Sequence, residues 1–169
     1  MSDLRVRPAT EADLTTLVRL RDGAARWMAT TAVTGQWRPG ELDEDHFRRV
    51  IDRDEVWLAE DAGRIVGAWE LWWTDEAAWG PQPPVAGYVH RLMVDRDTAA
   101  PGTGRRLLEA AEARVAEAGR SHVRLDCLAT NGPLSAYYRR AGFRVVGHLE
   151  RKPQPGGAAK SFTLLEKEL

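Results

Sequence analysis

A glycine-containing loop in the second half of the chain combines the residue types that bind a phosphate group. The apolar run Leu92–Val94 is followed by the turn-forming stretch Pro101–Gly104 and then by an amphipathic helical pattern. Glycine lets a backbone approach a ligand closely, and the N–H groups at a helix N-terminus attract anions such as pyrophosphate. No Lys-Ser/Thr pair follows, and Leu107 stands where a dinucleotide fingerprint has its third glycine. The spacing therefore predicts an anion site of another kind, with a plain turn into a helix as the alternative.

The single cysteine is predicted to be a core residue and not a nucleophile. Val123, Leu125 and Cys127 alternate with Arg124 and Asp126, as on one buried face of a strand. One cysteine forms no intramolecular disulfide and no Cys-based zinc site, and we expect no metal.

The composition predicts one globular domain over residues 1–169. The chain has 43% hydrophobic and 29% charged residues, and its 24 basic and 25 acidic side chains give a net charge of −1. That balance argues against a nucleic-acid partner. The N-terminus lacks an apolar signal region and no apolar run reaches membrane-spanning length, so we expect a cytoplasmic protein without a membrane partner.

Hydrophobic periodicity predicts an α/β (α+β) fold, with a mixed, mostly antiparallel sheet of six or seven strands flanked by about four helices. We expect residues 74–87, which contain three prolines, to form a long surface loop. The predicted strands are 4–8, 56–60, 65–73, 88–94, 122–128, 143–146 and 161–165, and the predicted helices begin near residues 14, 42, 104 and 134.

Several of these motifs together resemble the GNAT superfamily of acetyl-CoA-dependent N-acetyltransferases, over nearly the whole chain. They are the strand ending at Val94, the loop ending Gly102-Thr103-Gly104, and the later spacing Asn131-(x)6-Tyr138-(x)3-Gly142-Phe143. The resemblance implies that backbone amides of the loop bind the pyrophosphate of acetyl-CoA, the co-substrate. It also implies that the strand pairs with the pantetheine arm. The implied cofactor-binding residues are Leu92, Met93, Val94, Gly102, Thr103, Gly104, Arg105, Asn131 and Tyr138.

The loop departs from the family pattern at two places. Ala99 stands where the family has Gln or Arg, and Pro101 removes one amide donor. Arg105 or Arg106 could supply the missing positive charge, since guanidinium groups match phosphate well. Because the loop departs from the family pattern, we also consider an alternative function, a catalytically idle acyl-CoA-binding or sensor module.

An amine must lose its proton before it attacks a thioester. With a reference pKa near 10.4, about one amine in 10³ is neutral at pH 7, which adds roughly 4–5 kcal/mol to the barrier. We expect His90 to be the base, with Glu70 second and Asp126 third; the alternative is that these are hydrogen-bonded sheet residues. By the resemblance, Tyr138 lies beside the thioester sulfur. It would donate a hydrogen bond there, and act as a general acid only if its pKa is lowered.

All seven tryptophans lie between Trp27 and Trp79. By the resemblance this half of the chain supplies the acceptor side, so we expect a small-molecule or peptide amine with aromatic or cationic character. The loops 30–40, 74–87 and 151–160 are expected to form its walls. Trp79 is expected either to act as a lid or to pack on the surface, and the base rate favours a homodimer.

Overall fold

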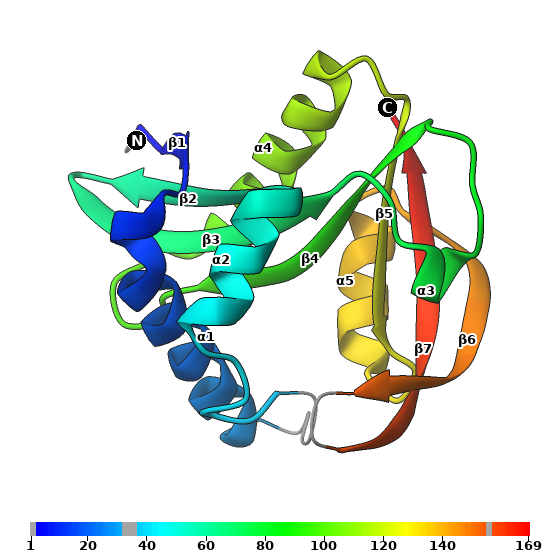
Figure 1. The fold of residues 1–169 in the computed structure, drawn as a ribbon, viewed down its shortest axis with the longest axis horizontal. Coiled ribbons are helices and arrows are strands. Elements are labelled where there is room, and N and C mark those ends of the chain that lie inside the picture. Colours follow the sequence, from blue (N-terminus) through cyan, green and yellow to red (C-terminus); the bar gives the residue numbers. More distant parts are fainter. Residues whose placement is uncertain (1–2, 32–36, 155–156) are drawn as a thin grey trace. The chain divides into compact units, whose positions relative to one another are not determined.

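The computed structural model describes residues 3–31, 37–154 and 157–169, and its strands form a seven-stranded sheet (Figure 1). The strand order is β1-β2-β3-β4-β5-β7-β6, as expected for a mixed α/β fold. Among the strand pairs whose register is described, β4–β5 is parallel and the others are antiparallel. The strands are β1 Arg5–Pro8, β2 Glu55–Asp61, β3 Arg64–Trp72, β4 Ala86–Val94, β5 His122–Leu128, β6 Arg144–Gln154 and β7 Gly157–Glu168. The helices are α1 Leu14–Ala29, α2 Glu44–Arg53, α3 Glu76–Trp79, α4 Thr103–Glu117 and α5 Gly132–Arg140, with a 3-10 turn at Glu11–Asp13.

The chain divides into two compact units. The first unit contains residues 1–71 and 91–111, and the second contains residues 72–90 and 112–169. The single domain expected over residues 1–169 stays a prediction. Among the described residues, no helix is long and apolar enough to cross a membrane.

In the first unit, hydrogen bonds fix the 3-10 turn that precedes α1. Asp13 accepts a hydrogen bond of 2.8 Å from the backbone N–H of Thr10, as in a capping box. Arg7 donates to the same carboxylate and holds the pKa of Asp13 at about 2. Leu17 of α1, Phe47 of α2 and other fully buried side chains then form the core beside the β1–β2–β3 ladder. The predicted strands 56–60 and 65–73 lie within β2 and β3, apart from Trp73, and pair as an antiparallel hairpin.

The segment predicted as a long loop contains a short helix, so that prediction is wrong in part. Asp75 accepts a hydrogen bond from the N–H of Ala78 and caps α3, and β4 begins at Ala86. A four-residue helix is too short to produce a recognisable apolar period, and proline at 81, 83 and 84 dominates the sequence signal.

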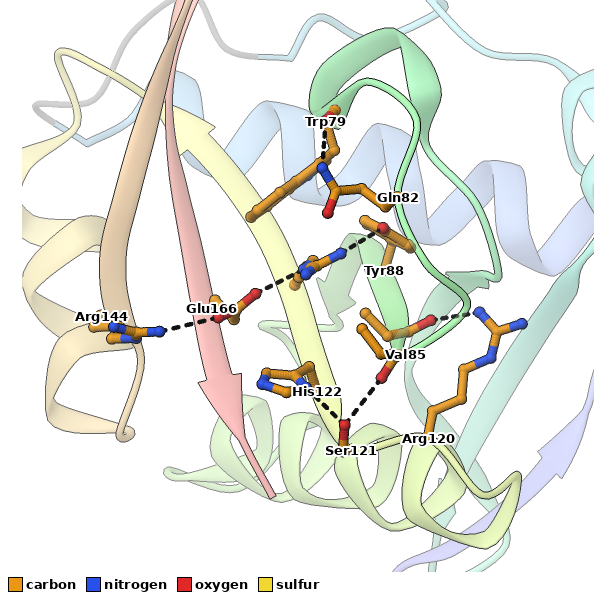
Figure 2. A network of polar contacts seen from close by, with 11 residues as sticks. Trp79, Gln82, Val85, Tyr88, Arg120, Ser121, His122, Arg144 and Glu166 are labelled. Atoms are coloured by element: carbon orange, nitrogen blue, oxygen red, sulfur yellow. Dashed lines mark hydrogen bonds and ion pairs between the residues drawn. The ribbon is translucent and has the colours of Figure 1, made fainter.

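The second unit is organised around Arg124 on β5, which is 7% exposed. Arg124 donates to Glu166 of β7 at 2.8 Å and to the hydroxyl of Tyr88 on β4 at 2.9 Å. Figure 2 shows Glu166 and Tyr88 in this network, with Arg144 on the far side of Glu166. Trp79 of α3 lies over the Arg124 guanidinium at 5.1 Å. Three strands and α3 are therefore joined by one buried cation.

The C-terminal hairpin is longer than the sequence pattern predicts. Residues 151–160 were expected to be a loop, but β6 and β7 pair through most of that range, with residues 155–156 outside the described part. Pro153 breaks the strand signal in the sequence. Because β6 is the terminal strand of the sheet, a proline without an N–H group is tolerated there.

Gly67 of β3 marks a place where the backbones of the first unit come very close. A methyl group at this position would lie 2.6 Å from the carbonyl oxygen of Met93 on β4 and 2.6 Å from Cδ1 of Leu107 on α4. Because one of these neighbours is backbone, the contact cannot be relieved by a rotamer change. Glycine at 67 thus lets β3 approach both β4 and α4.

We expect Gly67→Ala to lower the free energy of unfolding by about 1–3 kcal/mol, the usual cost of overpacking a core. Equilibrium denaturation in urea measures this change. Gly23→Ala is the matched control, because Gly23 lies in helix α1 and an added methyl there would have only an ordinary contact at 3.9 Å. The control should be unchanged or more stable, by up to about 1 kcal/mol. Equal stability of Gly67→Ala and the wild type would contradict the close approach.

Candidate active site

His90, Asp75 and Asp126 place one imidazole between two carboxylates in the second unit. His90 Nε2 lies 3.0 Å from Asp75 Oδ2, an ion-pair distance in an orientation outside that of a directed hydrogen bond. The ligand-type atoms of all three residues lie within 4.8 Å of one another. A divalent cation can use such donors, but a direct contact between His90 and Asp75 explains the same geometry without one. A base with an adjacent carboxylate is the arrangement used in general base catalysis.

Asp75 is fixed by the helix that it caps. Its Oδ1 accepts from Ala78 N at 3.3 Å, which leaves Oδ2 toward His90. The hydrogen bonds of Arg120 hold this segment in place. Arg120 donates to the carbonyl oxygens of Trp73 and Ala86, both at 2.7 Å, and so joins the two ends of the segment that carries α3. Asp75 is not among the functional residues predicted from the sequence. The only available signal was an Asp three residues before Ala78, as in a helix cap.

Trp72 completes this cluster, with its ring centroid 3.9 Å from that of His90. The His90 side chain is 11% exposed and that of Asp75 is 2% exposed. The contact with the indole restricts how the imidazole can rotate. The structure thus brings the expected base His90 together with Asp126, the third candidate, and with Asp75.

Tyr138 of α5 is buried in the same unit, near Asp126 and Cys127. Its ring packs against Tyr137 at 5.5 Å and Phe143 at 5.9 Å between centroids. Burial raises the pKa of Tyr138 above its ordinary value, and the nearby Cys127, Tyr137 and Asp126 act in the same direction. The phenol therefore stays protonated and can donate a hydrogen bond. The condition for proton release, a lowered pKa, is not met.

Cys127 is completely buried, as predicted for a core residue. Burial raises the pKa of its thiol to about 11, so the thiol stays protonated near neutral pH. A nucleophilic cysteine needs the thiolate form.

Asn131, an expected cofactor contact, uses its side-chain oxygen to accept from Leu134 N at 3.0 Å and so caps α5. Its position therefore fixes the start of the helix that carries Tyr138.

Strand β4 passes from the second unit to the first between His90 and Arg91. Its register with β5 runs from Ala86 to Tyr88, the last pair being Tyr88 and Arg124. Three residues later Arg91 adopts a left-handed backbone conformation with φ 49. Such a conformation is strained for a side-chain-bearing residue and is often kept at functional sites. The expected pantetheine partners, Leu92 to Val94, directly follow this residue.

The glycine loop opens α4 in the first unit as the spacing predicts. Gly102 has φ +84, which favours glycine. Thr103 N and Oγ1 both donate to the carbonyl oxygen of Ala100, at 3.2 and 2.7 Å. The next two amides, of Gly104 and Arg105, have no backbone acceptor among the described residues. Both amides lie in the first turn of the helix, where an anion is favoured.

Glu70 of β3 is completely buried and both of its oxygen atoms are engaged. Oε1 accepts from Arg91 Nη1 at 3.1 Å, and Oε2 lies 2.9 Å from Nε2 of His46. Both oxygens of this buried carboxylate face protein groups. The geometry therefore favours a positioning role over that of a base.

Four of the seven tryptophans lie over arginine side chains. Trp79 packs against Arg124 and Tyr88, which favours the packed alternative over the lid. Trp57 and Trp69 stack on each other in the first unit, and Trp72 contacts His90. The Arg–Trp pairs are Trp27 with Arg96, Trp37 with Arg21, Trp73 with Arg114 and Arg120, and Trp79 with Arg124.

The sequence matches the family model of the acetyltransferase (GNAT) domain over residues 52–145. The chain belongs to the GNAT acetyltransferase family. The matched segment of this acetyltransferase includes Glu70, Asp75, His90, the glycine loop and Tyr138. The resemblance predicted from the motifs is thus confirmed, as is the enzyme class.

Individual relatives of the acetyltransferase agree with this assignment. The uncharacterized N-acetyltransferase YesJ of Bacillus subtilis (strain 168) is 28% identical over 174 residues, 96% of this chain and 88% of that protein. A GNAT-family acetyltransferase structure from Listeria monocytogenes 4b F2365 is 28% identical with a TM-score of 0.77, covering 98% of this chain and 95% of that one. The PaiA N-acetyltransferase of Thermoplasma acidophilum, solved in complex with coenzyme A, is similar in fold, with a TM-score of 0.71, 17% identity and 99% coverage of both chains.

Proposed function

We propose that the acetyltransferase transfers the acetyl group of acetyl-CoA to the primary amine of a small molecule or peptide by direct attack on the thioester. The observation that supports it best is the gathering of a carboxylate-paired imidazole, His90 with Asp75, and a protonated phenol, Tyr138, within one unit. A protein that only bound acyl-CoA would need neither group. The coenzyme A in the PaiA structure fits the same co-substrate.

The residues expected to bind the co-substrate fit that role to different degrees. We assign the pyrophosphate to the amides of Gly104 and Arg105, which begin α4 without backbone acceptors in the described part of the chain. Gly102 supplies the left-handed turn, and Thr103 shapes the loop through Ala100. The backbone of Leu92, Met93 and Val94 would pair with the pantetheine arm as an added strand.

His90 is proposed to take the proton of the amine as its nitrogen attacks the acetyl carbon. The new C–N bond forms, the C–S bond breaks, and the sulfur leaves with the bonding electron pair. Asp75 would stabilise the positive charge that develops on the imidazole, because it lies 3.0 Å away in a buried position. Such a base typically contributes about 10²–10⁴-fold in rate.

Tyr138 is proposed to donate a hydrogen bond to the charge that develops on sulfur. Since burial keeps its phenol protonated, the donor is present over the whole neutral and mildly alkaline range. Full transfer of its proton to the thiolate, whose reference pKa is near 8.5, is uphill. We therefore assign electrostatic stabilisation to Tyr138, with bulk water as the final proton source.

The purified protein is expected to release free thiol from acetyl-CoA when primary amines are supplied. A panel of aromatic amines, amino acids and arginine-rich peptides, with thiol detection and mass spectrometry of the product, tests this directly. Equilibrium binding of CoA is measured in parallel. Tight CoA binding with no acetylated product from any amine would favour the alternative, an idle acyl-CoA-binding or sensor module.

We expect His90→Gln to lower kcat/KM by at least tenfold and to remove the acidic limb of the pH–rate profile, because the base is lost. Asp75→Asn should lower kcat less, since the base remains. Glu70→Gln tests the competing assignment, and His148→Gln is the matched control because His148 is exposed. Loss of the acidic limb in Glu70→Gln but not in His90→Gln would reverse the assignment of the base.

Tyr138→Phe should lower kcat by at least tenfold while CoA binding changes by less than about twofold, because the donor acts on charge that develops during the reaction. The raised pKa adds a second expectation: the wild-type profile should show no loss of activity from phenol ionisation below pH 10. Tyr137→Phe, one position earlier on α5, is the control. Unchanged kcat in Tyr138→Phe would refute the role.

A further inference from the structure

Arg21 of α1 is a buried guanidinium whose donors are only partly used. The residue is 3% exposed. Its Nη2 donates to Glu41 Oε2 at 3.0 Å. Its Nε and Nη1 are buried and have no hydrogen-bond partner within residues 3–31, 37–154 and 157–169. Buried donors without an acceptor are rare and costly, so two on one side chain point to a group that is supplied from outside.

A comparison within the same chain shows that this is not general for buried arginines here. Arg124 is buried to a similar degree, at 7% exposed. It uses Nε toward Glu166 and Nη1 toward Tyr88, the same two nitrogen types that Arg21 leaves unused. The protein itself provides hydrogen-bond acceptors for Nε and Nη1 of Arg124. For the same two atoms of Arg21, the described residues provide none.

The surroundings of Arg21 favour a flat, singly charged acceptor group. The Trp37 ring lies 4.1 Å from the guanidinium carbon and stacks on it. Arg91 lies close enough that its charge lowers the pKa of Arg21, in addition to the larger effect of burial. The positive charges of Arg21 and Arg91 both attract an anion.

The carboxylates that already pair with Arg21 and Arg91 limit the negative charge that a bound anion can carry. Glu41 pairs with Arg21, and Glu70 pairs with Arg91 at 3.1 Å and with His46. The two guanidinium groups are therefore balanced by two carboxylates. A carboxylate adds one negative charge, whereas a phosphate would add nearly two beside Glu41 and Glu70. Carboxylate geometry also matches the planar guanidinium.

We propose that Arg21, assisted by Arg91 and Trp37, binds the carboxylate group of a small-molecule ligand. The inference concerns a binding site in the first unit and goes beyond the proposed reaction. It places the carboxylate-binding residue on α1. Trp37 is partly exposed and covers the guanidinium, so the ligand would enter beside this ring.

Product-like ligands test the proposal without requiring turnover. N-acetyl amino acids and their carboxamides form matched pairs that differ only in the carboxylate, and the tryptophan, phenylalanine, methionine, leucine and lysine pairs cover the main side-chain types. Calorimetric titration into the CoA-bound enzyme gives each dissociation constant. In the wild type, at least one carboxylate should bind tenfold or more tightly than its carboxamide.

In Arg21→Gln this preference should fall below about twofold, and Arg21→Lys should recover part of it through charge alone. Arg26→Gln is the matched control, because Arg26 is exposed on the same helix and should keep the preference. Circular dichroism verifies that each variant folds. The proposal is overturned if carboxylate and carboxamide bind equally in every pair, or if no carboxylate binds. It is also overturned if the preference survives in folded Arg21→Gln. Tighter binding of N-acetylglucosamine 6-phosphate than of every carboxylate also overturns it, in favour of a phosphate.

Thiol release with the parent amino acids and their amides separates this inference from the reaction itself. Turnover of neutral amines without any carboxylate preference in binding would leave the acetyl transfer intact and remove the role of Arg21. A carboxylate preference in binding, lost in Arg21→Gln, without turnover of any amine would keep the carboxylate site and remove the proposed reaction.

Discussion

The side chain of Asp75 ties the local folding of the second unit to its chemistry. One oxygen caps α3 through Ala78 N, and the other lies 3.0 Å from His90. The cap thus holds the carboxylate in the position where its second oxygen faces the imidazole. The helix has four residues and could not form by its own propensity. It depends on Arg120, which joins the ends of its segment, and on Trp79, which packs over Arg124.

Arginine and tryptophan, both frequent in this chain, act together as packing pairs. A guanidinium over an indole ring keeps its in-plane donors available while its face is covered. In Arg124 those donors join three strands, and in Arg120 they reach two backbone carbonyls. Two of these pairs, Trp37 with Arg21 and Trp79 with Arg124, cover buried arginines. Trp37 alone covers a guanidinium with unused donors among the described residues.

Long periodic elements and glycine spacing could be predicted from the sequence, whereas short elements and side-chain pairings could not. β5 was predicted at its observed bounds, because alternation over seven residues is a strong signal. The start of α4 at the glycine loop followed from the same kind of pattern. Asp75 was missed because its role depends on a contact with His90, fifteen positions later in the chain, that no local pattern encodes. The engagement of both Glu70 oxygens likewise depends on His46 from another element.

The buried charges of the first unit are easier to explain by function than by stability. Burying the Glu70 carboxylate commonly costs more than its pairing returns, and apolar residues of similar volume often give equal or greater stability. Arg91 also carries the strain of a left-handed backbone within a strand. A chain that needed only a stable sheet would gain from a leucine in place of Glu70. The network instead holds the Arg91 guanidinium in a fixed orientation through Glu70. Fixed charges that require no rearrangement when a ligand arrives bind it with little loss of conformational freedom. The electrostatic cost in the unliganded protein is therefore consistent with preorganisation for an anionic group.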